Sequence, residues 1–325
     1  MAKNFNPPSR KTSSVSSGMK AKNFRFGGIP LPTKRWGEDT SGVSQWELHD
    51  LPKIAKDVRE DIVKMLLEAG SGHPAGSLSM TDILVALYFG IMHHDPKNPN
   101  WKERDRLVVS NGHTCPALYS VLARAGYFPV QKLKTYAKLG SSLQGHPERE
   151  KLPGIETTSG PLGCGLAQAC GMAWAARLDN SHFRVFCTVS DAEHDEGNHW
   201  EAVLFAAKYK LSNLTLIIDR NNIQIEGHTE DTMPLEPLKE KYIAFNWNAL
   251  DIDGHNIAAI INAIEEARRV DDRPTVIIAH TIPGKGVGFM EWDSEWHAKA
   301  PNFQETKIAL RELNRMQGKI VSEHD

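Results

Sequence analysis

Apolar residues recur at helical spacing from about residue 50 onward. An amphipathic helix ending at Gly70 is predicted from the following apolar positions, which lie three or four residues apart or are adjacent: Val58, Ile62, Val63, Leu66 and Leu67. A second helix is predicted to open at Ser79-Met80-Thr81-Asp82, which has the form of a capping box. Helices are also predicted before Asp251 and near residues 118–122, 167–176, 198–209, 257–269 and 304–316.

Short β-branched runs alternate with these helices. They predict strands at residues 107–109, 184–189, 214–218 and 275–279. Strands separated by helical segments imply an α/β fold with a mostly parallel sheet and helices on both faces. Ligands of open α/β sheets bind beyond the carboxyl ends of the strands, so the polar residues there are the candidates for function.

Composition narrows the class of protein. The 325 residues are 40% hydrophobic and 24% charged, with a net charge of −2, which is typical of a soluble globular chain. The near-neutral charge argues against a nucleic-acid partner, and no apolar run approaches the roughly 20 residues of a membrane span. The four cysteines have no C-x-x-C spacing, and the N-terminus has no secretory signal pattern, so we expect reduced thiols and a cytoplasmic location.

The N-terminal segment differs from the rest of the chain. Basic residues dominate positions 1–38, Ser and Pro are frequent, and the first acidic residue is Glu38. Such a segment buries too little apolar area to offset its ordering entropy, so we expect residues 1–45 to form a disordered tail. An organelle transit peptide is the alternative, since those are also basic and Ser-rich. Residues 46–325 are expected to form one domain.

Two polar side chains follow neighbouring predicted strands. Asp191 comes directly after one buried strand, and Asn221, thirty positions later, follows the next. Their oxygens, with the backbone carbonyl of Ile223, have the chemistry of Mg²⁺ ligands, and diphosphate and water would complete the octahedron. The alternative is structural: Asp191 caps the following helix and Asn221 forms a turn. The spacing leaves both open.

Four of the 14 histidines lie in similar loops. They are His73 in Ser-Gly-His-Pro, His113 in Asn-Gly-His-Thr, His146 in Gly-His-Pro-Glu and His297 in Glu-Trp-His-Ala. A single loop histidine is usually a solvated surface residue, but four in such settings favour a common site. Neutral imidazoles hold hydroxyls and transfer protons near neutral pH, and the spacing does not match a zinc site.

Two glycine-containing loops have different interpretations. The segment Gly160-Pro161-Leu162-Gly163-Cys164-Gly165 precedes a helix, so its backbone N–H groups are candidates to bind phosphate oxygens. Gly284-Lys285-Gly286 lacks the Ser or Thr and the spacer of a P-loop, and a turn is expected there.

Taken together, these motifs resemble one family, transketolase, in its N-terminal thiamine-diphosphate-binding half. The ordered match covers about residues 55–305. It consists of "SGHP" (71–74), "SNGH" (110–113), "GHPE" (145–148), "TSGPLGCGLAQACGMA" (158–173), "SDAEHDEGNHWEA" (190–202), "DRNNIQIEGH" (219–228) and "WHAKAP" (296–301). The resemblance implies a diphosphate-binding α/β domain, in agreement with the pattern of strands and helices.

The resemblance also implies roles for individual residues. Asp191, Asn221 and the Ile223 carbonyl correspond to ligands of Mg²⁺ (or Ca²⁺ or Mn²⁺). The implied contacts to thiamine diphosphate are made by His113, Gly160, Leu162, Gly163, Ala192 and the three metal ligands. Glu196 corresponds to a carboxylate at the subunit interface and is grouped with the cofactor site. The histidines implied to surround the ketose donor and assist proton transfer are His73, His113, His146 and His297.

The implied activity is transfer of a two-carbon ketol unit from a ketose or ketose phosphate to an aldose through a thiamine diphosphate adduct. In this family the aminopyrimidine-binding half, with most sugar-phosphate anchors, follows the present domain. Only about 20 residues follow "WHAKAP" here. We therefore expect the N-terminal subunit of a split transketolase, active only with a separate C-terminal subunit in an α₂β₂ assembly.

This chain departs from the family pattern at two places. The usual Gly-Asp-Gly is Ser190-Asp191-Ala192, and Asn222 stands where many transketolases have Gly. A glycine held at positive φ would be costly to replace, whereas Asn tolerates the left-handed region. The resemblance leaves two alternative functions open: the α subunit of a thiamine-dependent 2-oxo-acid dehydrogenase, and a non-catalytic transketolase-like paralogue.

Overall fold

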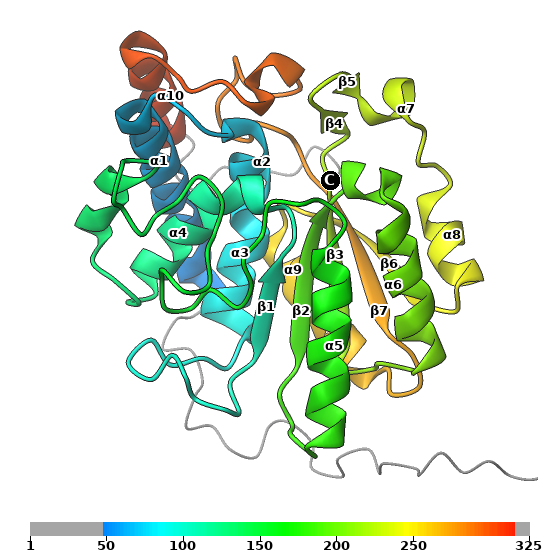
Figure 1. Ribbon diagram of the computed structural model, residues 1–325. Helices are drawn as coiled ribbons and strands as arrows, with labels where there is room; N and C mark the ends of the chain where they lie inside the picture. Colours follow the sequence, from blue (N-terminus) through cyan, green and yellow to red (C-terminus); the bar gives the residue numbers. More distant parts are fainter. Residues whose placement is uncertain (1–47, 316–325) are drawn as a thin grey trace, which may run out of the picture.

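The computed structural model describes residues 48–315. The predicted tail, residues 1–45, lies outside the described residues. A five-stranded sheet forms the centre of the described part, with the strand order β1-β2-β3-β7-β6 and parallel pairing throughout (Figure 1). Its strands are β1 (Arg106–Val109), β2 (Val185–Ser190), β3 (Leu214–Arg220), β6 (Asn248–Asp253) and β7 (Thr275–His280).

Helices cover both faces of the sheet because successive side chains of each buried strand point to opposite faces. In β2, Val185, Cys187 and Val189 join one apolar cluster, and Phe186 joins the other. The helices of the first cluster are α5 (Gly165–Leu178), α6 (Gly197–Lys208) and α8 (Leu238–Ala244). Those of the second cluster are α1 (Leu51–Ala69), α2 (Pro74–Ser79), α3 (Thr81–Ala86), α4 (Cys115–Arg124), α9 (Ile257–Arg269) and α10 (Phe303–Arg315).

The expected α/β class is confirmed, and most predicted elements are present. Helix α1 ends where predicted, since Gly70 has a φ of 67° and its N–H donates to the Leu66 carbonyl at 2.9 Å. The four predicted strands correspond to β1, β2, β3 and β7. Residues 284–286 form a turn, as expected, with φ of 76° at Gly284 and 92° at Gly286.

The predicted capping box at residues 79–82 is wrong. Ser79 is the last residue of α2, a helix that the sequence did not predict, and its hydroxyl donates to the Asp219 carboxylate at 2.7 Å. Asp82 forms a buried ion pair with Arg59, with a shortest N–O distance of 2.6 Å. Both side chains that the motif assigns to a helix cap therefore bind residues that are distant in the sequence instead.

Strand β6 was also missed, because it is a half-exposed edge strand without an apolar run. Beyond the carboxyl edge of the sheet lie the short antiparallel pair β4 (Ile223–Gln224) and β5 (Gly227–His228), then α7 (Thr229–Thr232) (Figure 1). The remaining short segments are η1 (Leu48–Asp50), η2 (Leu87–Ile91), η3 (Gly112–Thr114), η4 (Val130–Thr135), η5 (Ala192–Asp195) and η6 (Ser294–His297).

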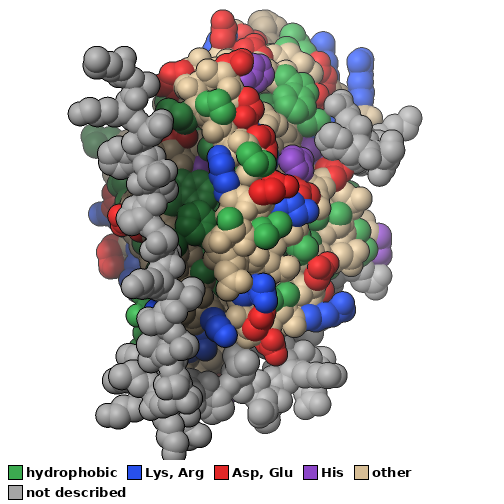
Figure 2. Space-filling view, turned by 90° about the vertical axis from the view of Figure 1, so that its right-hand side faces the viewer, with side chains coloured by type: hydrophobic (Ala, Val, Ile, Leu, Met, Phe, Trp, Pro, Cys, Tyr) green, Lys and Arg blue, Asp and Glu red, His purple; other side chains and the backbone are tan. Residues whose placement is uncertain are grey.

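The surface agrees with the composition. Figure 2 shows acidic and basic side chains interspersed over one face of the molecule, in keeping with the net charge of −2. The four cysteines are free thiols, as expected. Among the described helices, none combines the length and apolar character that a membrane crossing requires.

Candidate functional site

Parallel pairing brings the two predicted metal ligands together. Ser190 of β2 pairs with Asp219 of β3, so Asp191 and Asn221 leave adjacent strands at the same edge. The N–H of Asn222 donates to Asp191 Oδ2 at 2.7 Å, which joins the two turns directly. The convergence expected from the strand ends is therefore present.

Asp191 is a fully buried carboxylate with defined partners. Its Oδ1 accepts the Ala192 N–H at 2.9 Å, and its Oδ2 accepts Arg220 Nη1 at 3.1 Å. Burial raises the pKa of Asp191 to about 7, although the neighbouring Arg220 acts in the opposite direction. The side chain also caps η5, so the structural role considered from the sequence is real and coexists with the candidate metal role.

Asn221 is held in one orientation. Its Oδ1 accepts the Ile223 N–H at 3.1 Å, and its Nδ2 donates to Asp219 Oδ2 at 3.0 Å. This is the turn that the sequence allowed. The amide oxygen, the Asp191 carboxylate and the Ile223 carbonyl are hard oxygen donors that suit Mg²⁺, Ca²⁺ or Mn²⁺. Among residues 48–315, no group of three His, Cys, Asp or Glu side chains is placed to hold a metal ion.

The departures from Gly-Asp-Gly cause no backbone strain. Neither Ser190 nor Ala192 is among the described residues with positive φ, so the side chains at these positions need no left-handed conformation. Asn222 does have a φ of 64°, a value that Asn tolerates well. The cost that a positive φ would have imposed at Ser190 and Ala192 is therefore absent.

Gly163 is required by close packing. Its φ is 74°, and a Cβ there would lie 2.5 Å from Asn198 Oδ1 and 2.6 Å from Glu196 Cβ. Its N–H donates to Glu193 Oε2 at 2.7 Å, and the N–H of Gly165 donates to the Ser110 hydroxyl at 3.0 Å. Protein acceptors thus occupy these two amides in the structure, and the expected contact of the loop with phosphate stays a prediction.

The four predicted histidines form one cluster. His73 precedes α2, His113 lies in η3, His297 ends η6, and His146 lies in the loop before the glycine segment. The ring centroid of His73 lies 5.3 Å from that of His113, 6.3 Å from His146 and 5.7 Å from His297. The ring centroids of His113 and His297 are 5.4 Å apart. Segments distant in sequence thus place four imidazoles around one point.

These imidazoles are neutral at pH 7. Burial, with the neighbouring His297 and His146, lowers the pKa of His73 to about 4. Burial also lowers the pKa of His113 well below its usual value. It lowers the pKa of His146 and His297 as well, with Glu226 opposing the effect at His297. A neutral ring offers one N–H donor and one acceptor nitrogen, which suits hydroxyl binding and proton transfer.

Residues 160–165, called the glycine loop below, lie between the histidine cluster and the turn that follows β2 at Asp191. At one end, a Cβ on Gly160 would lie 3.7 Å from the His146 ring, and one on Gly112 would lie 2.5 Å from Ser159 Oγ. At the other end Gly163 packs against Glu196. Leu162, between them, is 37% exposed. The Gly163 N–H donates to Glu193, whose other oxygen accepts the Ser190 N–H, so hydrogen bonds join the loop to the residue before Asp191.

Several buried polar atoms along this path lack a protein partner. Among the described residues they include His73 Nδ1, Asn111 Nδ2, Ser159 Oγ and Asn198 Oδ1. Buried polar atoms are normally hydrogen-bonded, so these four unpaired atoms are available to bind a polar ligand. The residues present fit a diphosphate cofactor with its cation: hard oxygen donors, a close-packed glycine loop and unused hydrogen-bonding atoms.

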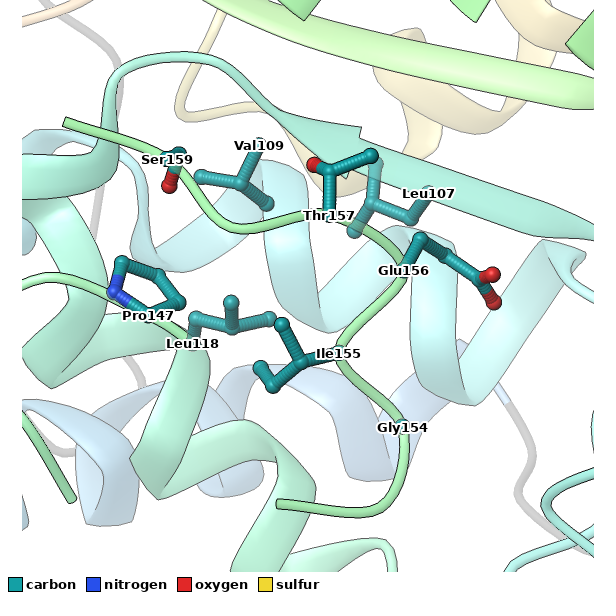
Figure 3. Close-up of a pocket in the computed structure, with 9 residues that line it drawn as sticks. All are labelled: Leu107, Val109, Leu118, Pro147, Gly154, Ile155, Glu156, Thr157 and Ser159. Carbon is teal, nitrogen blue, oxygen red and sulfur yellow. The ribbon is translucent and has the colours of Figure 1, made fainter. Parts of the chain in front are cut away.

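A small cavity beside the segment that precedes the glycine loop is not the candidate site. It has a volume of about 10 Å³ and lies under the segment that includes Gly154, Glu156 and Ser159, against β1 and α4 (Figure 3). That volume holds about one water molecule, so no cofactor or sugar fits there.

The sequence analysis missed three side chains of this site. Arg220 contacts Asp191, Glu193 binds the Gly163 N–H, and Asn198 packs on Gly163. Arg220 and Glu193 lie within the motifs that carry the family resemblance, close to the residues that were singled out. Their only signal in the sequence was a charge close to the end of a buried strand, where burial requires a partner for the charge.

Glu196, the carboxylate implied at a subunit interface, is exposed. It lies among other acidic side chains: burial together with the charges of Glu196 and Glu226 raises the pKa of Asp195. The structure therefore places Glu196 at the surface of the described part of the chain, next to the glycine loop that it contacts at Gly163.

Comparison with known proteins decides the family. Residues 52–315 match the model described as transketolase, thiamine diphosphate binding domain. The chain belongs to the transketolase family. It is 41% identical over 266 residues to the 6-deoxy-6-sulfo-D-fructose transketolase subunit SqwG of Clostridium sp. (strain MSTE9), covering 82% of this chain and 97% of that protein.

Other relatives differ in how much of their length is matched. An apulose-4-phosphate transketolase subunit of Phocaeicola vulgatus is 38% identical over 82% of this chain and 95% of its own length. The transketolase structure from Campylobacter jejuni superimposes with a TM-score of 0.77 at 35% identity, covering 83% of this chain but only 43% of that chain. The present chain thus spans less than half of the solved transketolases and nearly all of the subunit relatives.

The matches confirm the family, the fold and the thiamine-diphosphate-binding domain expected from the sequence. They also confirm the expectation of a subunit of a transketolase-type transferase. The roles of the individual site residues stay predictions.

Proposed function

We propose that this chain is the N-terminal subunit of a two-subunit transketolase that transfers a two-carbon ketol unit from a ketose or ketose phosphate to an aldose. One observation carries the proposal: four neutral histidines adjoin, through the glycine loop, an oxygen-donor set at the carboxyl edge of the sheet. This arrangement combines groups for sugar hydroxyls with groups for a metal-bound diphosphate in one continuous site.

The chain's own residues would anchor the cofactor. Asp191, Asn221 and the Ile223 carbonyl would hold Mg²⁺, or Ca²⁺ or Mn²⁺, against the diphosphate. The residues proposed to contact the cofactor alongside them are His113, Gly160, Leu162, Gly163 and Ala192. Bound thiamine diphosphate supplies an electron sink for breaking the carbon–carbon bond beside a carbonyl.

The histidines would orient the sugar and move protons. His73 lies at the centre of the cluster, and its buried Nδ1 has no protein partner. Because its pKa is lowered to about 4, the ring accepts or donates a hydrogen bond at neutral pH without carrying charge. His113, His146 and His297 would surround the same substrate chain and limit the positions of its hydroxyls.

A second subunit is needed to complete this site. The described residues supply candidate metal ligands and histidines, and the relatives matched over nearly their whole length are named as transketolase subunits. We propose a separate C-terminal subunit in an α₂β₂ assembly in the cytoplasm. Exposed Glu196, close to Asp195 and Glu226, would lie at the contact between subunits.

Donor preference tests the proposed reaction. The chain is co-purified with its C-terminal subunit, then supplied with thiamine diphosphate and Mg²⁺. It is expected to use ketose phosphates and to leave pyruvate and other 2-oxo acids unreacted. His73→Ala and Asp191→Asn should each abolish turnover, whereas His182→Ala, at an exposed histidine, should not. Turnover of 2-oxo acids would point to a dehydrogenase α subunit; failure to bind the cofactor would point to a non-catalytic paralogue.

A further inference from the structure

Arg220 is a buried cation at the edge of the candidate metal site. Its side chain is 2% exposed, and it follows Asp219 at the end of β3. The guanidinium donates to Asp191 Oδ2 at 3.1 Å and to the Thr229 hydroxyl at 2.7 Å through Nη1. Through Nη2 it reaches Glu230 at 2.6 Å and Glu236 at 3.0 Å. A single side chain thus links the Asp191 turn to residues 229–236.

The two oxygens of Asp191 are used unequally. Oδ2 accepts two hydrogen bonds, from Arg220 Nη1 and from the Asn222 N–H, whereas Oδ1 accepts one, from Ala192. A carboxylate oxygen has about two lone-pair sites, so Oδ2 is saturated and Oδ1 keeps one site open. Arg220 therefore determines which oxygen faces a cation.

The guanidinium is itself fixed in place. Glu230 also accepts the Leu235 N–H at 3.1 Å, and Glu236 accepts the Leu238 N–H at 2.8 Å, so neither carboxylate is free to swing away. Both glutamates are about half exposed, yet they hold a buried arginine. They draw the positive charge toward residues 229–236, which limits its competition with a metal ion for Asp191.

We propose that Arg220 is a positioning residue that makes Asp191 a one-oxygen ligand and thereby favours Mg²⁺ over Ca²⁺. The inference rests on the proposed function, since it concerns the same metal site. Mg²⁺ demands a compact octahedron, whereas the larger Ca²⁺ accepts carboxylates through both oxygens. Removing the donor to Oδ2 opens that oxygen and should improve the site for Ca²⁺ relative to Mg²⁺.

Cation titrations of thiamine diphosphate binding test the proposal. The chain with its co-purified partner subunit is titrated with Mg²⁺ or Ca²⁺ at fixed thiamine diphosphate, and tryptophan fluorescence is followed; Trp296 lies beside His297 in η6. Arg220→Gln should raise the Mg²⁺ midpoint by about 10-fold or more, the usual effect of losing a residue that orients a metal ligand. The Ca²⁺ midpoint should change much less, so the ratio of the Mg²⁺ midpoint to the Ca²⁺ midpoint should rise, which means a preference shifted toward Ca²⁺.

Two further variants separate positioning from general damage. The double variant Glu230→Gln with Glu236→Gln keeps Arg220 but weakens its anchoring, and should shift the ratio in the same direction by a smaller factor. Arg273→Gln, at an exposed arginine paired with Asp272, should leave both midpoints unchanged. If Arg220→Gln weakens the binding of Mg²⁺ and Ca²⁺ equally, or changes the binding of neither, the proposal is overturned. Absence of cation-dependent binding in the unaltered complex would instead count against the proposed function.

Discussion

Individual residues near Asp191 show which parts of the site a sequence pattern can reveal. Asp191 and Asn221 were predicted because each directly follows a buried strand, and parallel strands end at one edge. Arg220 and Glu193 were not, since their roles depend on partners from other segments: Glu230 and Glu236 for one, the Gly163 N–H for the other. Strand-end position is a local signal, whereas a buried charge network is a tertiary one.

Gly163→Ala is expected to destabilise the chain. The added Cβ would collide with Asn198 and Glu196, and alanine disfavours a φ of 74° by about 1–2 kcal/mol before any clash. Gly171→Ala is the matched control, since it lies in α5 and an added Cβ would meet no atom within 4 Å. That substitution should stabilise the helix by about 0.5–1 kcal/mol. Urea unfolding measures both, and equal effects would contradict the packing argument.

Protonation of His73 is expected to destabilise the fold in mild acid. Its folded pKa of about 4 lies below the ordinary value of 6.5, so between these values the unfolded chain binds the proton more readily. Stability from this group is therefore full above pH 6.5 and falls as the pH decreases toward 4. Urea unfolding should show that the free energy of unfolding decreases less from pH 7 to pH 5 in His73→Gln than in the unaltered chain. Identical losses in both would show that His73 is not buried in neutral form.

At the scale of elements, hydrophobic periodicity predicted the helices and strands that are buried on at least one face. It failed for an exposed edge strand and for side chains that bind distant partners. Helix α1 is amphipathic, strands β2, β3 and β7 are largely apolar and buried, and all four were found from the sequence. Strand β6 is half exposed at the sheet edge and shows no such pattern. The false capping box had the right residue types, but Ser79 and Asp82 bind distant partners instead.

Asp82 joins three elements, so its removal should be costly. Its carboxylate pairs with Arg59 of α1 at 2.6 Å and with His255, before α9, at 2.8 Å. Burial alone would raise its pKa, but Arg59 and His255 hold it at about 2. Asp82→Asn leaves a buried arginine without its counter-charge, and the expected loss is about 3–5 kcal/mol of unfolding free energy.

Acid adds a second test of this ion pair. Because the folded pKa of Asp82 lies below the ordinary value of 3.8, its stabilisation is full above pH 3.8 and is lost as the pH falls toward 2. Over this range, the free energy of unfolding measured with denaturant should fall more steeply in the unaltered chain than in Asp82→Asn. An Asp82→Asn variant as stable as the unaltered chain at pH 7 would contradict the assigned role.

For the whole molecule, the motifs predicted more than the composition did. Length, charge and cysteine spacing indicated only an ordinary soluble chain. Seven ordered motifs indicated the family, which the match over residues 52–315 confirms. The chain spans 97% of one subunit relative and 43% of a solved transketolase. The relatives matched over nearly their whole length are named as transketolase subunits, which supports the proposed partner subunit.

Ketol transfer by the chain with and without a C-terminal transketolase subunit from the same organism tests the central claim most directly. Both preparations receive thiamine diphosphate, Mg²⁺, a ketose phosphate donor and an aldose acceptor. We predict no transfer by the chain alone, and transfer that rises with added partner until the two subunits are equimolar. Full ketol transfer by the chain alone would contradict the account, as would no transfer by any mixture that forms the complex and binds the cofactor.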